Sequence, residues 1–189
     1  MSYIIGVDLM LKLDTKQIFV DAIVELSKTK PIEKITIQNI VDCCGAGRQT
    51  FYNHFSDKEE LIEYVYLCDR KKGEEILKND YSLKKHMIEI LNLCAEKRQF
   101  YIRAYSIYGQ NSLSESVFGA AVEYYENLVV QKAGKEALDD DMKVAIRFNC
   151  YGELGLVKEW IKENIRCSSE KMSDIIIDNI PERLKKYLD

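Results

Sequence analysis

Proline and glycine are scarce in this sequence, with two prolines and nine glycines among 189 residues. Because these two residues interrupt regular structure most strongly, their scarcity argues against a turn-rich β fold and favours long helices. We find no alternation of apolar and polar residues strong enough to predict a sheet. The hydrophobic content of 47% is enough for a sizeable core and argues against disorder. The composition therefore predicts an all-α protein.

Long apolar runs are also missing. No stretch reaches the roughly 18 consecutive apolar residues that a membrane-spanning helix needs. Residues 1–13 are apolar, but they carry neither a positively charged start nor a small-residue cleavage site, so they do not resemble a signal peptide. They are compatible either with a disordered leader or with an extension of the first helix. We expect a soluble, cytoplasmic protein without a membrane partner.

Cysteine pairs with metal-binding or redox spacing are absent, because the six cysteines form no C-x-x-C motif. Most lie among apolar residues at helical spacing, where a free thiol behaves as a small hydrophobe. We interpret them as reduced thiols, with a redox or metal role as the alternative. The sequence predicts no metal site and no cofactor. The cysteines are Cys43, Cys44, Cys68, Cys94, Cys150 and Cys167.

Positive charge is not in excess, since the formal net charge is −4. This balance excludes a generally basic coat for nucleic acid, but it leaves room for a local DNA site, because the charge on one face is what matters. A glycine-rich phosphate loop and a convincing nucleophile–base set are also lacking. We therefore do not expect an enzyme; a small helical enzyme is the alternative from another functional class.

The first helix is expected to begin at Asp14, where Asp14 and Gln17 have the spacing of a capping box. Pro31 is expected to end it, because proline disfavours the helical conformation of the preceding residue. Its apolar residues recur at helical spacing and predict one buried face. They are Ile18, Phe19, Ala22, Ile23 and Leu26.

The stretch 36–58 predicts two short helices joined by a glycine turn. Thr36 is the expected N-cap of the first, and Gly45 ends it in the left-handed conformation that glycine adopts at little cost. Gly47 then starts a second short helix, expected over 48–55. The side chains expected to face inward are Ile37, Ile40, Val41, Cys44, Phe51 and Phe55. A capping box over 56–59 opens the next helix, which we expect to reach about residue 78.

The second short helix carries polar side chains that suit a DNA-reading helix-turn-helix. Arg48 can donate two hydrogen bonds to guanine, and Gln49 can pair with adenine. Thr50 can contact a base, while Tyr52 and His54 suit phosphate oxygens. The alternative is a merely solvated helix, with Tyr52 half-buried and His54 capping or packing. The predicted DNA-binding residues are Thr36, Gly47, Arg48, Gln49, Thr50, Tyr52, Asn53, His54 and Lys58.

The rest of the chain keeps a helical pattern. We expect helices over 83–96, 99–108, 113–132 and about 139–164, and a last helix capped by Ser169 and interrupted by Pro181. The two expected domains are a helix-turn-helix head, 14–60, and a helical body, 61–189. The helix over 139–164 is apolar around much of its circumference, which predicts burial on more than one side.

The segment TIQNIVDCCGAGRQTFYNHFSDKEELI, residues 36–62, closely resembles the signature of the TetR/AcrR family of bacterial transcriptional regulators. In that family a threonine begins the second helix, a glycine forms the turn, and T-[FL]-Y-x-[HY]-F precedes a K-E-x-L helix start. Firm resemblance covers about residues 14–68. Val41 stands where the family usually has alanine, and Gly47 where it often has a hydroxyl cap, which removes one phosphate contact. With residues 152–176, the chain also resembles the branch that includes activators of dihydroxyacetone-kinase genes.

The resemblance implies a homodimer on near-palindromic double-stranded DNA, joined through its last two long helices; a monomer that buries these side chains itself is the alternative. The predicted dimer residues are Phe148, Gly152, Gly155, Leu156, Trp160, Ile176 and Ile180. It also implies a cavity in the body for a small-molecule effector; an activator gated by a regulatory protein partner is the alternative. The candidate ligand-binding residues are Tyr64, Tyr101, Arg103, Tyr105, Tyr108, Tyr124, Arg147 and Tyr151.

Overall fold

The computed structural model describes residues 2–76, 82–107, 109 and 112–188. Every regular element within these ranges is a helix, which confirms the all-α prediction. No helix in the described part of the chain is long and apolar enough to cross a membrane. In chain order the elements are α1 (Ser2–Thr29), η1 (Ile32–Lys34), α2 (Ile37–Cys44), α3 (Arg48–Tyr52), α4 (Lys58–Ile76), α5 (Leu83–Glu96), α6 (Arg98–Ala104), α7 (Leu113–Ala133), η2 (Lys135–Ala137), α8 (Asp140–Ile161), α9 (Ser169–Asp178) and α10 (Glu182–Lys185).

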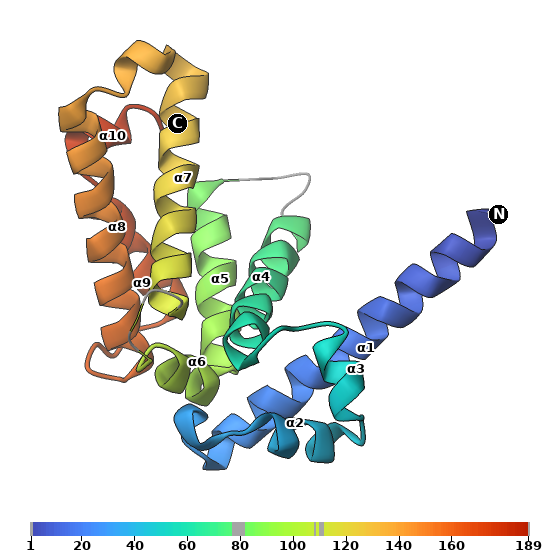
Figure 1. Ribbon diagram of the computed structural model, residues 1–189. Helices are drawn as coiled ribbons and strands as arrows, with labels where there is room; N and C mark the ends of the chain where they lie inside the picture. Colours follow the sequence, from blue (N-terminus) through green and yellow to red (C-terminus); the bar gives the residue numbers. More distant parts are fainter. Residues whose placement is uncertain (1, 77–81, 108, 110–111, 189) are drawn as a thin grey trace.

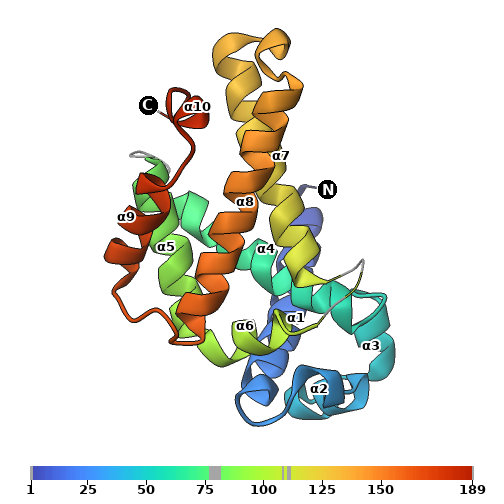
Figure 2. The same cartoon turned by 90° about the vertical axis from the view of Figure 1, so that its left-hand side faces the viewer.

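The helices form two connected parts (Figure 1). The short helices α2 and α3 lie with the C-terminal part of α1 at one end, and the remaining helices form an elongated body. Helices α7 and α8 run side by side away from the head, and the turn η2 joins them at the far end (Figure 2). Helix α9 packs against α5 and α8. The head meets the body where α1 packs against α4 and α6 and where η1 packs against α6.

Helix α1 is longer than the sequence predicted. It begins at Ser2, so Asp14 lies inside the helix and does not cap it. Of the two interpretations of residues 1–13, the structure has the helical extension, whose start projects away from the body in Figure 1. No proline interrupts this segment, and one continuous helix satisfies its backbone groups. The helix ends before Pro31, as expected.

The predicted buried face of α1 is wrong at one residue. Ile18 is 39% exposed, whereas Phe19 and Ile23 are fully buried. Val20 is buried instead. Helix α1 packs against both α2 and α4, and the face that they cover is rotated about the helix axis relative to the predicted face. Periodicity gives the width of an apolar face but not the exact rotation at which its neighbours cover it.

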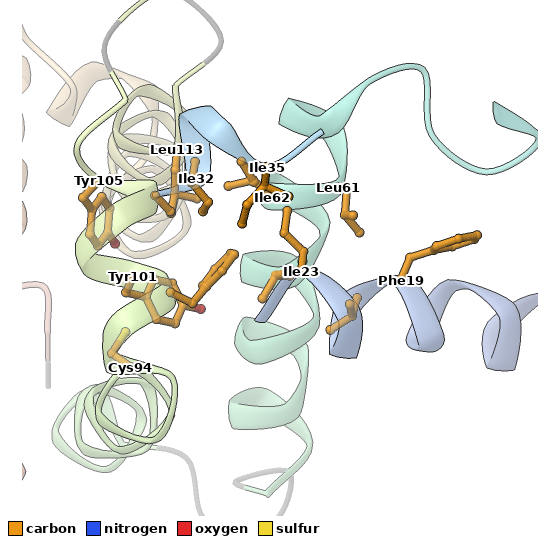
Figure 3. Packing of buried hydrophobic residues seen from close by; sticks show 14 of the residues in the cluster. Phe19, Ile23, Ile32, Ile35, Leu61, Ile62, Cys94, Tyr101, Tyr105 and Leu113 are labelled. Carbon is orange, nitrogen blue, oxygen red and sulfur yellow. The ribbon is translucent and has the colours of Figure 1, made fainter. Parts of the chain in front are cut away.

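A single buried cluster runs from the head into the body. Phe19 and Ile23 of α1 pack with Ile32 and Ile35, and the same cluster continues to Tyr101 of α6 (Figure 3). A second cluster lies between α7, α8 and α10, and its central residues include Tyr125, Ile146 and Leu184. The first cluster holds the head against the body, because close-packed side chains from both parts belong to it.

Helix boundaries in the body agree with the sequence for α5 and α7, but α6 ends at Ala104 and not at residue 108, and α8 ends at Ile161 and not at about residue 164. Helix α5 has the predicted bounds, and Pro181 starts the short helix α10. Two caps are shifted by one residue. Ser168, not Ser169, caps α9, and at the start of α4 Asp57 accepts from the backbone N–H of Glu60. In both places adjacent residues offer the same capping chemistry, so the sequence does not separate them. The expected end of α4 near residue 78 lies outside the described residues.

Candidate nucleic-acid interface and ligand cavity

Helix α2 begins with a complete capping box. The hydroxyl of Thr36 accepts a hydrogen bond from the backbone N–H of Asn39 at 3.2 Å, and the side-chain oxygen of Asn39 accepts one from the N–H of Thr36 at 3.2 Å. The ammonium of Lys30 donates to that same Asn39 oxygen at 2.6 Å. Thr36 itself is exposed. The cap therefore fixes the start of α2 and ties it to the end of α1.

The turn between α2 and α3 depends on two glycines that adopt different conformations. Gly45 has φ 69° and ψ 19°, the left-handed conformation expected for it, and its N–H donates to the carbonyl of Val41. Gly47 is extended, with φ −87° and ψ 152°, and its position as N-cap of α3 provides no side-chain hydrogen bond. The turn thus requires glycine for backbone reasons only at Gly45.

Two buried phenylalanines hold α3 in place. The rings of Phe51 and Phe55 lie 5.4 Å and 6.1 Å from that of Phe19 on α1, in edge-to-face arrangements that favour aromatic pairs. The helix is shorter than predicted and ends at Tyr52, but the N–H of Phe55 still donates to the carbonyl of Phe51 at 2.9 Å. This last turn keeps both rings on the inner side.

The outer side of α3 carries the residues predicted to contact DNA. Arg48 and Gln49 are exposed at its N-terminal end, and Thr50 is half-exposed. Tyr52 is 48% exposed, so it does not belong to the core. The amide of Gln49 donates to the side chain of exposed Asn53 at 3.1 Å. These side chains form one polar surface whose orientation is set by the buried rings behind it.

Two of the residues predicted to contact phosphate also contact other residues of the protein. The ammonium of Lys58 donates to the carbonyl oxygens of Ile32 at 2.8 Å and of Ile35 at 3.1 Å. An ammonium has three donors, so one remains after these bonds. His54 is half-buried, and its ring centroid lies 6.3 Å from that of Phe19. Lys58 thus joins the start of α4 to the connector before α2, a role that the sequence did not reveal.

The body contains a cavity of about 540 Å³ between α4, α5, α6, α7 and α8. Three of the predicted ligand-binding residues line it: Tyr101, Tyr105 and Tyr124. The cavity also contains charged residues that sequence reasoning did not select, namely Asp69, Arg70, Glu123 and Glu153. His86 lines it as well. Its size falls within the range typical of small-molecule sites.

The other candidate ligand residues lie elsewhere. The ammonium of Lys16 lies 4.5 Å from the ring centroid of Tyr64, on the head side of α4, and Arg103 donates to the carbonyl of Lys28 at 3.5 Å. Arg147 and Tyr151 are exposed on α8 and pack against Phe118 from outside. These four predictions were wrong as cavity residues, because aromatic and basic side chains at helical spacing give no direction relative to a cavity. Tyr108 lies outside the described residues.

Asp69 on the cavity wall belongs to a largely buried ion pair. Asp69 of α4 is 4% exposed and pairs with the ammonium of Lys97. The hydroxyl of Tyr101 donates to the other oxygen of Asp69 at 2.6 Å. Burial raises the pKa of Tyr101, and the neighbouring Cys94 and Asp69 raise it further. The periodicity of α4 contains a signal for Asp69, since it follows buried Val65 by four residues and therefore belongs to the buried face.

A second, partly buried carboxylate, that of Glu153 on α8, also lines the cavity. Oε1 of Glu153 accepts a 2.5 Å hydrogen bond from the hydroxyl of Tyr125 and a 2.8 Å bond from the amide of Asn149. Burial raises the pKa of Glu153, although both hydrogen bonds oppose this effect. Glu153 follows buried Cys150 and Ile146 on the inner face of α8, so the same periodicity argument identifies it.

Helix α8 also presents an apolar stripe to solvent. Val144, Phe148 and Tyr151 are 67%, 72% and 64% exposed, and Gly152 and Gly155 continue the stripe at helical spacing. Such exposed apolar surface is unusual in a monomer. The expected burial of α8 on several sides is therefore not complete within one chain.

Three predicted dimer residues are not available on that surface. Trp160, Ile176 and Ile180 are 4%, 2% and 2% exposed and belong to the chain's own core. The indole N–H of Trp160 donates to the carbonyl of Cys167 at 2.9 Å, which holds the ring inside. Leu156 is half-buried. Apolar composition indicated burial correctly here but did not distinguish burial within the chain from burial between chains.

Two family models match the chain. A model for bacterial regulatory proteins of the tetR family matches residues 19–65, and a model for a transcriptional regulator C-terminal region matches residues 81–182. No curated protein matches the chain. Together the two models cover the head and most of the body, so the family resemblance seen in the sequence is confirmed.

Solved structures show the same fold. The dihydroxyacetone kinase operon activator DhaS is 22% identical with a TM-score of 0.62, over 93% of this chain and 98% of that one. A protein described as a TetR-family transcriptional regulator from Syntrophomonas wolfei str. Goettingen is 18% identical with a TM-score of 0.58, over 92% and 93%. A TetR transcriptional regulator from Rhodococcus sp. RHA1 is 16% identical with a TM-score of 0.54, over 89% and 99%.

Proposed function

Because the chain belongs to the TetR family of bacterial transcriptional regulators, we propose that it is a homodimer that binds near-palindromic DNA and is controlled by a small-molecule effector. Helix α3 reads bases in the major groove, the exposed stripe of α8 joins two protomers, and the cavity in the body binds the effector. The observation that carries the proposal is the outer surface of α3, which is polar and exposed and is held in place by the buried rings of Phe51 and Phe55.

The base-reading role is supported by the position of α3. Its N-terminal half presents Arg48 and Gln49, whose side chains have the donors and acceptors for guanine and adenine edges. Thr50 follows them. The buried rings of Phe51 and Phe55 fix the rotation of the helix, so these side chains leave the protein in a defined direction. A preorganised reading helix loses little conformational entropy on binding.

Thr36, Tyr52 and His54, with the remaining donor of Lys58, surround α3 and are proposed to contact phosphates. Such contacts set the register of a protein on DNA without reading its sequence. Gly47 contributes a backbone N–H at the start of α3, where helix N-termini favour anions.

Dimerisation is supported by the stripe Val144–Phe148–Tyr151 with Gly152 and Gly155. Two copies of one such stripe can pack together around a two-fold axis, each burying the apolar side chains of the other. The glycines leave room for close approach, since a Cβ built at either position meets no atom within 4 Å. A two-fold dimer presents two reading helices about 34–36 Å apart, one DNA turn, to a near-palindrome.

Effector control is supported by the position of the cavity. Its wall includes Asp69 and Arg70 of α4, and the same helix is tied at its first residue, Lys58, to the head. A ligand that favours one arrangement of α4 therefore changes the relative free energies of two head orientations. A cavity of about 540 Å³ favours a small molecule over the alternative of a protein partner as the controlling signal.

The decisive experiment selects DNA sequences from a random pool with the purified protein and measures affinity for the enriched sequence. We expect a near-palindrome, a stoichiometry of two chains per site and an affinity that falls steeply with salt. Enrichment of no sequence, or equal affinity for scrambled DNA, would contradict the proposal. A response of the bound complex to a protein partner alone, with no small molecule active, would favour the protein-gated activator.

A further inference from the structure

Asp69 and Glu153, a buried and a partly buried carboxylate of the cavity wall, differ in how their charge is compensated. Asp69 has a direct cationic partner in Lys97. Glu153 has only neutral partners, Tyr125 and Asn149. Among the residues that the structure describes, no lysine or arginine forms an ion pair with Glu153. A carboxylate withdrawn from water without a counter-charge is costly, and an arriving cation recovers that cost.

The hydrogen bonds of Glu153 leave one side of the carboxylate available. Both donors, the Tyr125 hydroxyl and the Asn149 amide, reach Oε1. Oε2 therefore remains as an acceptor for a donor entering the cavity that Glu153 lines. Tyr125 and Asn149 hold the carboxylate in one orientation, so the acceptor is preorganised.

The walls around this acceptor are largely aromatic and aliphatic. Tyr66, Tyr101, Tyr105 and Tyr124 line the same cavity, and tyrosine faces attract cations. The basic residues on the wall are Arg70 and His86, and Arg70 directly follows the acidic Asp69 in sequence. The combination of apolar walls with a partly buried carboxylate that has no cationic partner among the described residues favours a ligand that has an apolar body and a positively charged end.

We propose that the cavity recognises an organic cation, a protonated amine with an aromatic or aliphatic body, whose ammonium donates to Oε2 of Glu153. This inference rests on the proposed effector role of the cavity and names the chemical class of the ligand. The raised pKa of Glu153 agrees with it, since burial without a counter-charge produces that shift.

The proposal is tested with three probes that share one body: 4-phenylbutylamine, 4-phenylbutan-1-ol and 4-phenylbutyrate. Calorimetry at pH 7 measures their binding to the full chain without DNA. We expect one site per chain, with the amine bound more tightly than the alcohol and the carboxylate weakest. Glu153→Gln keeps an acceptor for Tyr125 and removes the charge. We expect it to weaken amine binding by about 10-fold or more while changing alcohol binding by less than about 2-fold.

Glu123→Gln is the matched control, because Glu123 also lines the cavity but is exposed to solvent. It is expected to leave the order of the probes unchanged. The proposal is overturned if the alcohol or the carboxylate binds as tightly as the amine, if none of the three binds, or if Glu153→Gln preserves the preference for the amine. An adequate fold of Glu153→Gln is verified by its thermal unfolding.

DNA binding is measured in parallel, so that a failure of the cation site can be distinguished from a failure of the proposed regulatory function. A protein that selects the amine through Glu153 but enriches no DNA sequence supports the cation site and contradicts the regulatory function. A protein that binds its selected DNA but shows no preference for the amine contradicts the cation site and leaves the regulatory function supported.

Discussion

The ammonium of Lys58 lies 2.8 Å from the carbonyl oxygen of Ile32, so the first residue of α4 is bonded to the connector between α1 and α2. A second bond, to the carbonyl of Ile35, completes this clamp. The residue predicted from the sequence as a phosphate contact therefore also holds the head together.

Replacing Lys58 by methionine is expected to destabilise the protein by about 1–3 kcal/mol, because two charge-assisted hydrogen bonds are lost while the aliphatic stem is kept. Urea unfolding measures the change. Lys28→Met is the control, since Lys28 is exposed and forms an ion pair with exposed Glu25. Equal stability of the two variants would show that the clamp contributes nothing. A salt slope of DNA binding lower by about one in Lys58→Met would show that the third donor contacts phosphate.

The two glycines of the turn are expected to respond differently to alanine. Gly45→Ala should cost about 1–2 kcal/mol, because the left-handed conformation is unfavourable for a residue with a Cβ. No atom lies within 4 Å of that Cβ, so the cost is conformational rather than steric. Gly47→Ala should be nearly neutral, since its backbone is extended and its Cβ meets only Thr50 Oγ1 at 3.7 Å. Chemical unfolding of both variants checks the difference.

Arg48→Ala is expected to lower affinity for the selected DNA by about 1–3 kcal/mol and to relax base preference at one position of each half-site. The side chain is exposed, so stability should not change. Titration against a set of single-base variants of the selected site makes the measurement. A uniform loss across all sequences would instead assign Arg48 to phosphate.

If the proposed dimer forms through α8, Phe148→Glu is expected to convert it into a folded monomer, because Phe148 is 72% exposed and contributes little to the chain's own core. Sedimentation velocity measures the oligomeric state and circular dichroism the fold. Gly152→Ala sharpens the test: it should favour helix α8 in the monomer yet weaken the dimer if helices approach closely there. Lys143→Ala, off the stripe, is the control. Dimers that persist in Phe148→Glu would place the interface elsewhere.

Glu153 is expected to contribute a destabilisation of the protein that grows as pH rises above about 4.5. Its folded pKa is raised from the ordinary value of 4.5 by burial, against the hydrogen bonds of Tyr125 and Asn149. Between the unfolded and folded pKa values the native state holds more protons than the unfolded state, so this carboxyl destabilises the fold with rising pH. Glu153→Gln should therefore gain stability relative to the unmodified protein as pH rises. A difference in unfolding free energy that is independent of pH would contradict this.

Local signals predicted much of the head and of the helix pattern. Thr36 caps α2, Gly45 ends it in the left-handed conformation and α5 has its predicted bounds, because each feature depends on neighbours within one helical turn. Phe51 and Phe55 were placed in the core by their spacing alone. The family resemblance came from the same contiguous stretch.

Features that depend on distant residues were not predictable in this way. The carbonyl that Lys58 reaches belongs to Ile32, 26 positions earlier. Trp160 was expected at a dimer interface and lies inside, because a single sequence does not tell which partner covers an apolar side chain. The cavity residues Asp69 and Glu153 follow buried residues of their helices at helical spacing. This spacing identifies them as inward-facing only when the buried face of each helix is already known.

The cluster that begins at Phe19 and continues to Tyr101 limits how the chain can be recombined with its relatives. A chimera joined at residue 60 would pair the α1–α3 surface of one regulator with α4 and α6 of another, and the side chains on the two sides have to interlock. Exchange of the four outward residues Arg48, Gln49, Thr50 and Tyr52 leaves that junction intact. DNA specificity is therefore better changed by substituting these exposed residues than by exchanging the whole head domain.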